Sequence, residues 1–498
     1  MTLRDDDDWL ENADIVIDGE KIVAVGQDLV PDSFGVEKIM DGKNRLITPG
    51  LVNAHLHSFD RFDIGRFDNL PLEVWWALFS PPIGKGYEWT ARECYLRTIL
   101  NCLEMLKTGT TMVIDDVIHG NPLCPENIDA VFQAYQDVGM RAQVSIHSWD
   151  KPYCSFMPYL EDILPANLKE ELAQIAMNPN QMIDLWRSYG QRWRGRVQFI
   201  LAASGPQRCS DEFMKKTWSL SKELDLPVFT HVLETKVQAV TGREYYGESL
   251  VEHMKSLGVL TPKTTLIHAV WVTDNDIELI SEAGSSVVHN PISNLKLGSG
   301  IAPIRKMLDF GINIGIGTDN NNGNDTANMF EAIKVAALLH KVSHFDYDRW
   351  VGASEVIRMA TRGGARCGCL HEELGYLSTG MKADLVLYDL NKLPFIPRNN
   401  LLYQLVFCEH GESVNTVIVD GNVVVEGGRV INVDEQKLVG EVMERVEEIQ
   451  HKIRRASARG GELEPYFRQA YFKCVQQDIG FSAYSGSEAP RIAQKIER

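Results

Sequence analysis

The chain alternates between short apolar segments and amphipathic segments over most of its length, and this pattern predicts strands and helices in turn. Amphipathic, helix-periodic stretches include residues 92–107, 211–223, 273–283 and 326–340. Eight apolar segments have the length and β-branched content of buried strands: residues 47–52, 110–114, 141–146, 197–202, 228–230, 265–267, 286–288 and 312–316. Eight β/α units predict an α/β fold, a (β/α)8 TIM-like barrel, with its chemistry at the carboxyl ends of the strands.

Short-strand patterns also occur at both ends of the chain. Residues 13–24 predict a hairpin that turns at Asp18-Gly19, and residues 414–425 predict another that turns at Asp420-Gly421. Together with a strand at residues 383–388, these regions can pair into one composite sheet domain.

Three parts of the chain are therefore expected. Residues 1–48 and 383–435 form a small β-sandwich domain built from both ends, and residues 49–382 form the barrel. Residues 436–498 begin with a charged, helix-periodic run and are predicted to be a C-terminal helical extension.

Composition narrows the class of protein. The 498 residues carry a net charge of −18, which argues against binding to nucleic acid or to an anionic membrane. The nine cysteines follow no disulfide spacing, and the chain begins without an apolar signal segment. We expect a cytoplasmic protein whose partner is a small molecule.

The segment Pro49-Gly50-Leu51-Val52-Asn53-Ala54-His55-Leu56-His57 carries the first candidate chemistry. Residues i and i+2 of a strand point to the same side, so His55 and His57 can aim two imidazoles at one point. Imidazole nitrogens suit zinc, iron, nickel or copper. Two histidines on one strand are by themselves more often structural, so a metal site here needs further ligands from later segments of the chain.

Further polar residues come after later predicted strands. They are His231, with Glu234 three residues on, and then His268, His289 and Asp319. Strand ends of a parallel barrel surround one mouth, so these side chains should meet there. Taken singly, each could be a loop or capping residue; taken together, they predict a metal site with a nearby proton shuttle.

Other polar residues near strand ends are less informative. Asp115 and Asp116 could support the site or only the fold, and His119 and His147 are interpreted as structural. Asn320, Asn321, Asn322 and Asn324 could contact substrate or form a turn. The remaining histidines are interpreted as surface or packing residues: His253, His340, His344, His371, His410 and His451. Residues 197–204 hold no lysine that could bridge two metals, which predicts a single ion.

These segments resemble the amidohydrolase superfamily, and most closely its branch of s-triazine hydrolases (atrazine chlorohydrolase, melamine deaminase) and S-adenosylhomocysteine and methylthioadenosine deaminases. The resemblance runs in family order from Pro49 to Val386. It rests on residues 49–57, His231-Val232-Leu233-Glu234, Ile267-His268, residues 289–297, Gly300-Ile301-Ala302-Pro303, Gly317-Thr318-Asp319 and Ala383-Asp384-Leu385-Val386.

The resemblance implies one divalent ion per chain, Zn²⁺ or Fe²⁺, held by His55, His57, His231 and Asp319. It assigns proton transfer to Glu234, orientation of water to His268, and a second role as base to Asp319. It places His289 at the substrate, and the same role is expected of Asn320 and Gln207. Relatives often form oligomers, so a homo-oligomer is expected.

The implied activity is hydrolytic deamination of a nitrogen-rich heterocycle such as an aminopyrimidine, an aminotriazine or a cyclic guanidine. Hydrolysis or closure of a cyclic amide or ureide, hydrolytic dehalogenation, and an inactive binding protein on the same fold remain alternatives. Departures from the adenosine-type pattern at Gly84, Ile146-His147 and Gln207 argue against an adenosine nucleoside. The family usually opens with one more strand, so either the small domain lacks it or the chain given starts late.

Overall fold

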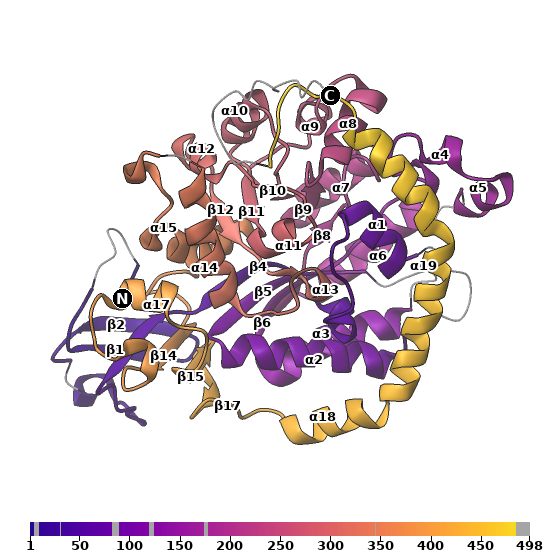
Figure 1. Cartoon of the computed structure of the whole chain (residues 1–498). Coiled ribbons are helices and arrows are strands. Elements are labelled where there is room, and N and C mark those ends of the chain that lie inside the picture. The colour runs from indigo at the N-terminus through magenta and orange to yellow at the C-terminus, as the bar shows by residue number, and fades with distance from the viewer. Residues whose placement is uncertain are drawn as a thin grey trace.

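The computed structural model describes residues 1–3, 9–29, 31–81, 89–118, 124–173, 178–343 and 345–484 (Figure 1). The expectations for Gly84, His119 and His344, and for residues 4–8 and 485–498, lie outside these residues.

A closed ring of parallel strands forms the centre of the molecule (Figure 1). The ring runs through β4 (Leu51–His57), β5 (Thr110–Val117), β6 (Arg141–Ile146), β7 (Val197–Phe199) with β8 (Leu201–Ala202), β9 (Val228–Val232), β10 (Thr264–His268), β11 (Ser286–His289), and β12 (Ile314–Ile316) with β13 (Asp319–Asn320). One residue separates β7 from β8, and two separate β12 from β13. Since β13 pairs with β4, the ring closes, and the predicted eight-stranded barrel is confirmed.

Helices surround this ring, as the alternating pattern predicts (Figure 1). They are α2 (Ala91–Lys107), α3 (Pro125–Val138), α6 (Pro179–Arg192), α7 (Asp211–Leu224), α8 (Lys236–Tyr246), α9 (Leu250–Ser256), α10 (Asp274–Ala283), α11 (Pro291–Lys296), α12 (Ile304–Asp309), α14 (Met329–Leu339), α15 (Ala353–Arg358) and α16 (Gly364–Cys367). Shorter helices in the loops include α1 (Leu72–Phe79), α4 (Leu160–Ile163), α5 (Ala166–Leu172), α13 (Asn321–Asn324) and α17 (Leu401–Phe407). Inside the ring, Val52, Met112, Ile200, Phe229 and Ile267 pack into a hydrophobic core, so the barrel is filled below its polar mouth.

A second sheet is built from both ends of the chain. It has the order β17 (Arg429–Val430), β16 (Asn422–Glu426), β15 (Val414–Val419), β14 (Leu385–Asp389), β3 (Arg45–Pro49), and all its pairings are antiparallel. The hairpin of β1 (Ala13–Asp18) and β2 (Lys21–Gln27) packs on it through Ile22, Leu385, Leu387 and Ile418. This composite β-sandwich is the one the sequence predicts; the exact domain limits remain a prediction.

The predicted strand at residues 47–52 is in fact two strands. β3 belongs to the small sheet and β4 to the barrel, and the chain passes between them at Gly50. A Cβ there would lie 2.0 Å from Oγ1 of Thr111, so only glycine allows this close crossing.

The C-terminal segment consists of α18 (Glu435–Glu444) and the long helix α19 (Val446–Val475), which runs along the edge of the barrel (Figure 1). Leu463 and Phe467 are buried on it, and Lys452 pairs with the buried Glu93 of α2 at 2.6 Å. Within the described residues, none of the helices has the length and apolar character needed to cross a lipid bilayer.

A buried ion pair joins the barrel to the small sheet. Arg141 on β6 donates to Asp384 at 2.8 and 3.0 Å and to Asp420 at 2.7 Å. We expect Arg141→Met to lower the free energy of unfolding by about 3–5 kcal/mol, because the substitution leaves buried Asp384 without its counter-charge. Denaturant unfolding measures this change. Lys169→Met, in an exposed pair with Glu161, is the control and should have little effect; equal losses in both variants would contradict the prediction.

Candidate active site

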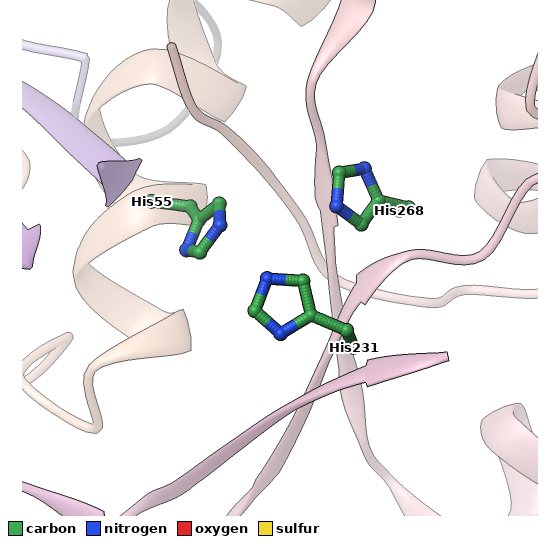
Figure 2. A group of neighbouring side chains, drawn as sticks. All are labelled: His55, His231 and His268. Carbon is green, nitrogen blue, oxygen red and sulfur yellow. The ribbon is translucent and has the colours of Figure 1, made fainter. Parts of the chain in front are cut away.

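Polar side chains from several strands of the barrel converge at its mouth, and Figure 2 shows His55, His231 and His268 pointing toward one another. Asp319 lies among them: its Oδ1 is 3.3 Å from Nε2 of His55 and 3.5 Å from Nε2 of His57. Ligand atoms of His55, His57 and Asp319 lie within 4.8 Å of one another, as do those of His55, His231 and His268. The structure therefore brings His231, His268 and Asp319 together with His55 and His57, whereas His289, which was expected at the same mouth, belongs to neither group.

Some of the possible ligand atoms in this group have no well-formed hydrogen bond among the described residues, which leaves them free to bind a cation. Both ring nitrogens of His55 and Oδ1 of Asp319 are buried without a well-formed hydrogen bond among the described residues. Such orphaned polar atoms are costly unless something binds them. Three imidazoles and one carboxylate match the ligand types that zinc and ferrous iron take, so the residues fit a divalent metal.

Electrostatics keep the group in a form that can bind a cation. Burial lowers the pKa of His55, and burial with the neighbouring histidines lowers the pKa of His231 well below its ordinary value. Burial would raise the pKa of Asp319, but its contacts with His55 and the nearby His268 hold that pKa well below the usual range. The set therefore offers neutral imidazoles at His55 and His231 and an ionised carboxylate, which is the protonation state that metal binding needs. Despite burial, Asp319 and Asp116 raise the pKa of His57, so this ring must lose a proton when a metal binds.

Partners behind the imidazoles fix which nitrogen faces the centre. Nδ1 of His57 donates to the carbonyl oxygen of Asp116, and Nδ1 of His231 lies 3.2 Å from the carbonyl oxygen of Ser204. Each contact turns Nε2 toward the site, which is how outer partners orient metal-binding histidines. Asp116 also accepts from Nδ1 of His147 at 2.6 Å, so of its two open interpretations this geometry favours support of the site.

Glu234 and His268 lie next to each other at one side of the site. Oε2 of Glu234 lies 3.5 Å from Nε2 of His268, and that nitrogen lies 3.8 Å from Oδ2 of Asp319. Burial, with Asp319 and Glu73 nearby, raises the pKa of Glu234 well above its ordinary value, which favours its protonated form. Burial lowers the pKa of His268 to about 4, so its ring is neutral. Two carboxyl groups with opposite shifts can act as acid and base in one reaction.

The backbone at the mouth is strained. Leu233, His268, Ala269 and Asp319 all have left-handed φ values, of 51°, 74°, 47° and 64°. This conformation is unfavourable for residues other than glycine, and such strain gathers at functional sites. No feature of the sequence pattern indicates it.

The pocket beside these groups is lined by residues that the sequence pattern did not single out for the site. Trp75 and Trp76 of α1, Arg208 after β8 and Gln238 of α8 line it together with His147. Gln238 also positions Glu234, because its Oε1 accepts from the backbone N–H of Glu234 at 3.0 Å. Arg208 and His147 both come after predicted strands, and this position was the available signal.

Only one of the three residues expected to bind substrate lines the pocket. Asn320 lines the pocket. Gln207 and His289 are buried but are not among the residues that line it, and Nε2 of His289 lies 3.2 Å from Nε2 of His340. Asp115 has a structural place, since it accepts from the backbone of Ser58 and from the hydroxyl of Tyr135, each at 2.8 Å.

Comparison with known proteins agrees with this geometry. The Amidohydrolase family model matches residues 46–424. A 5-methylthioadenosine/S-adenosylhomocysteine deaminase of Caldanaerobacter subterraneus subsp. tengcongensis is 33% identical over 448 residues, which cover 89% of this chain and 96% of the relative.

Two solved structures support the same relationship. An adenosine deaminase from Xanthomonas campestris with bound zinc superposes with a TM-score of 0.80 at 26% identity, covering 91% of this chain and 97% of that one. Atrazine chlorohydrolase from Arthrobacter aurescens TC1, complexed with zinc, gives 0.77 at 25% identity over 89% and 96%. Both branches of the resemblance are thus confirmed, and the chain belongs to the amidohydrolase family.

Proposed function

We propose that the protein is a metal-dependent hydrolase that deaminates a nitrogen-rich heterocycle with water and releases ammonia. The observation that carries this proposal is that Glu234 and His268 lie beside the cluster of histidines and Asp319 at the barrel mouth. The family and the deaminase relative point to the same reaction class.

His55, His57, His231 and Asp319 are the residues that would hold one ion, Zn²⁺ or Fe²⁺. A bound divalent ion lowers the pKa of water to about 7 and so supplies a nucleophile at neutral pH. The zinc in the two solved relatives favours zinc.

Side chains of this protein carry out the remaining steps, which are the orientation of water and the transfer of protons. Water attacks the ring carbon that carries the amino group, and Oδ2 of Asp319, which already accepts from Ser293 at 2.6 Å, receives the proton that water loses. His268 orients the water through Nε2. Glu234 donates its proton to the ring nitrogen next to that carbon. Asp319 then passes the proton it took from water to the amino nitrogen, the remaining hydroxyl proton returns to Glu234, and the C–N bond breaks to release ammonia.

The raised pKa of Glu234 has a consequence for the pH profile. The proposed reaction needs the protonated carboxyl group, which is fully present below the raised pKa and is lost as pH rises through it. We therefore expect kcat/KM to fall on the alkaline side, and a pH series at saturating metal measures this. An activity that only rises with pH would contradict the role of Glu234 as acid.

The first experiment is metal analysis of protein purified without chelator, with ammonia release from aminopyrimidines, aminotriazines, guanine, cyclic guanidines and adenosine-type nucleosides. One metal per chain and ammonia from any ring would support the proposal. Chloride from a chlorotriazine in place of ammonia would favour dehalogenation, which the similarity to atrazine chlorohydrolase keeps as the second candidate. Opening of a cyclic amide or ureide would favour amide hydrolysis, and a protein that cannot be loaded with metal would favour a binding role.

We also propose that the protein works in the cytoplasm, since all nine cysteines are free, and that it forms homo-oligomers.

A further inference from the structure

One charged group on the pocket wall makes no ion pair with the described residues. Arg208 lines the pocket together with Glu234. Its Nε is buried and has no hydrogen-bond partner among the described residues, and its Nη1 makes one long bond, 3.4 Å, to Oγ of Ser204. Glu73, the other nearby carboxyl group, accepts from Thr235, and burial raises its pKa and thus favours its neutral form. Glu234 and Glu73 lie near the guanidinium group, but neither pairs with it, so its N–H donors remain largely unused.

The guanidinium group is nevertheless held in place. Its Cζ lies 4.8 Å from the ring centroid of Trp76 and 5.3 Å from that of Phe156. Stacking on aromatic rings offsets only part of the cost of removing a cation from water. A second donor, Nε1 of Trp75, is also buried without a partner among the described residues, and Trp75 lines the same pocket. The pocket wall therefore carries two N–H donors, Nε of Arg208 and Nε1 of Trp75, that have no acceptor among the described residues.

We propose that Arg208 is a specificity-determining residue that binds an oxygen acceptor of the substrate, either a ring carbonyl or a carboxylate. The planar fork of N–H donors in arginine matches such oxygens. Arg208 and Glu234 come after the neighbouring strands β8 and β9, so the ring edge protonated by Glu234 lies beside the group that Arg208 holds. This inference rests on the proposed function for the identity of the ring, but binding by Arg208 can be measured without turnover.

The test uses the metal-loaded full chain and three matched pairs of compounds. The pairs are guanine with 2-aminopurine, isoguanosine with adenosine, and 4-aminopyrimidine-5-carboxylate with 4-aminopyrimidine. Ligand-induced shifts in Tm report binding, and ammonia release reports turnover. The wild type should bind the oxygen-bearing member of at least one pair about 10–100-fold more tightly. The pair that responds separates a ring carbonyl from a carboxylate.

Arg208→Gln should abolish that preference by raising the Kd and KM of the oxygen-bearing compound, with little effect on those of its partner. Arg208→Lys keeps the charge and most of the packing and should retain part of the preference. Arg196→Gln is the control, because Arg196 is also partly buried with an Nε that has no partner among the described residues, but it lies just before β7 and donates to Gln136.

A wild type that treats both members of every pair alike, or an Arg208→Gln protein that keeps the preference, would overturn the inference. Absence of ammonia from all compounds would count against the deaminase proposal alone, since the shifts in Tm would still decide the role of Arg208.

Discussion

Glu234→Gln is expected to lower kcat by about 10²–10⁴-fold while the metal content stays unchanged. Glutamine has nearly the same shape and can keep the neighbours of Glu234, but it has no carboxyl proton to give to the ring nitrogen. The backbone N–H of Glu234 donates to Gln238, which should hold the loop in place in the variant. Steady-state kinetics and metal analysis on one preparation measure both quantities.

The matched control is Glu282→Gln, which removes an exposed carboxylate near the end of α10. This control should keep wild-type kcat. Normal turnover in Glu234→Gln would remove Glu234 from the proposed proton path, and loss of metal in that variant would indicate a structural defect in the cluster.

His55→Ala and Asp319→Ala are each expected to remove metal and activity together. Loss of an outer partner of a metal ligand already costs about 10–100-fold in affinity, and these substitutions would remove candidate ligands themselves. Asp319 supplies the carboxylate that lies against both His55 and His57, so its loss also leaves the cluster without the negative charge that balances a divalent ion.

Metal content per chain after dialysis without added metal measures this effect, and His371→Ala, which removes an exposed histidine, is the control. Circular dichroism separates loss of metal from loss of fold. Full metal content in either His55→Ala or Asp319→Ala would contradict the proposed ligand set.

The sequence predicted those site residues whose positions follow from where the strands end and how side chains alternate along them. His55 and His57 share one side of a strand because side chains alternate, and His231, His268 and Asp319 each come after an apolar run. A parallel barrel places all such strand ends at one mouth, so the fold class and the gathering of these residues could be predicted together. His289 shows the limit of this reasoning: it also ends a strand, yet it pairs with His340 and is not among the pocket-lining residues.

By itself, the sequence determined the barrel, the composite sheet and the polar residues at the mouth, because strand periodicity and turn chemistry are local properties of the chain. Only the tertiary structure decided that Asp116 supports His57 and His147, that Trp75 and Arg208 form the pocket wall, and that the small sheet is tied to the barrel through Arg141 and Asp384. These contacts join residues far apart in the chain. The shifted pKa of Glu234 likewise depends on burial and on neighbours from other strands, which exist only once the chain has folded.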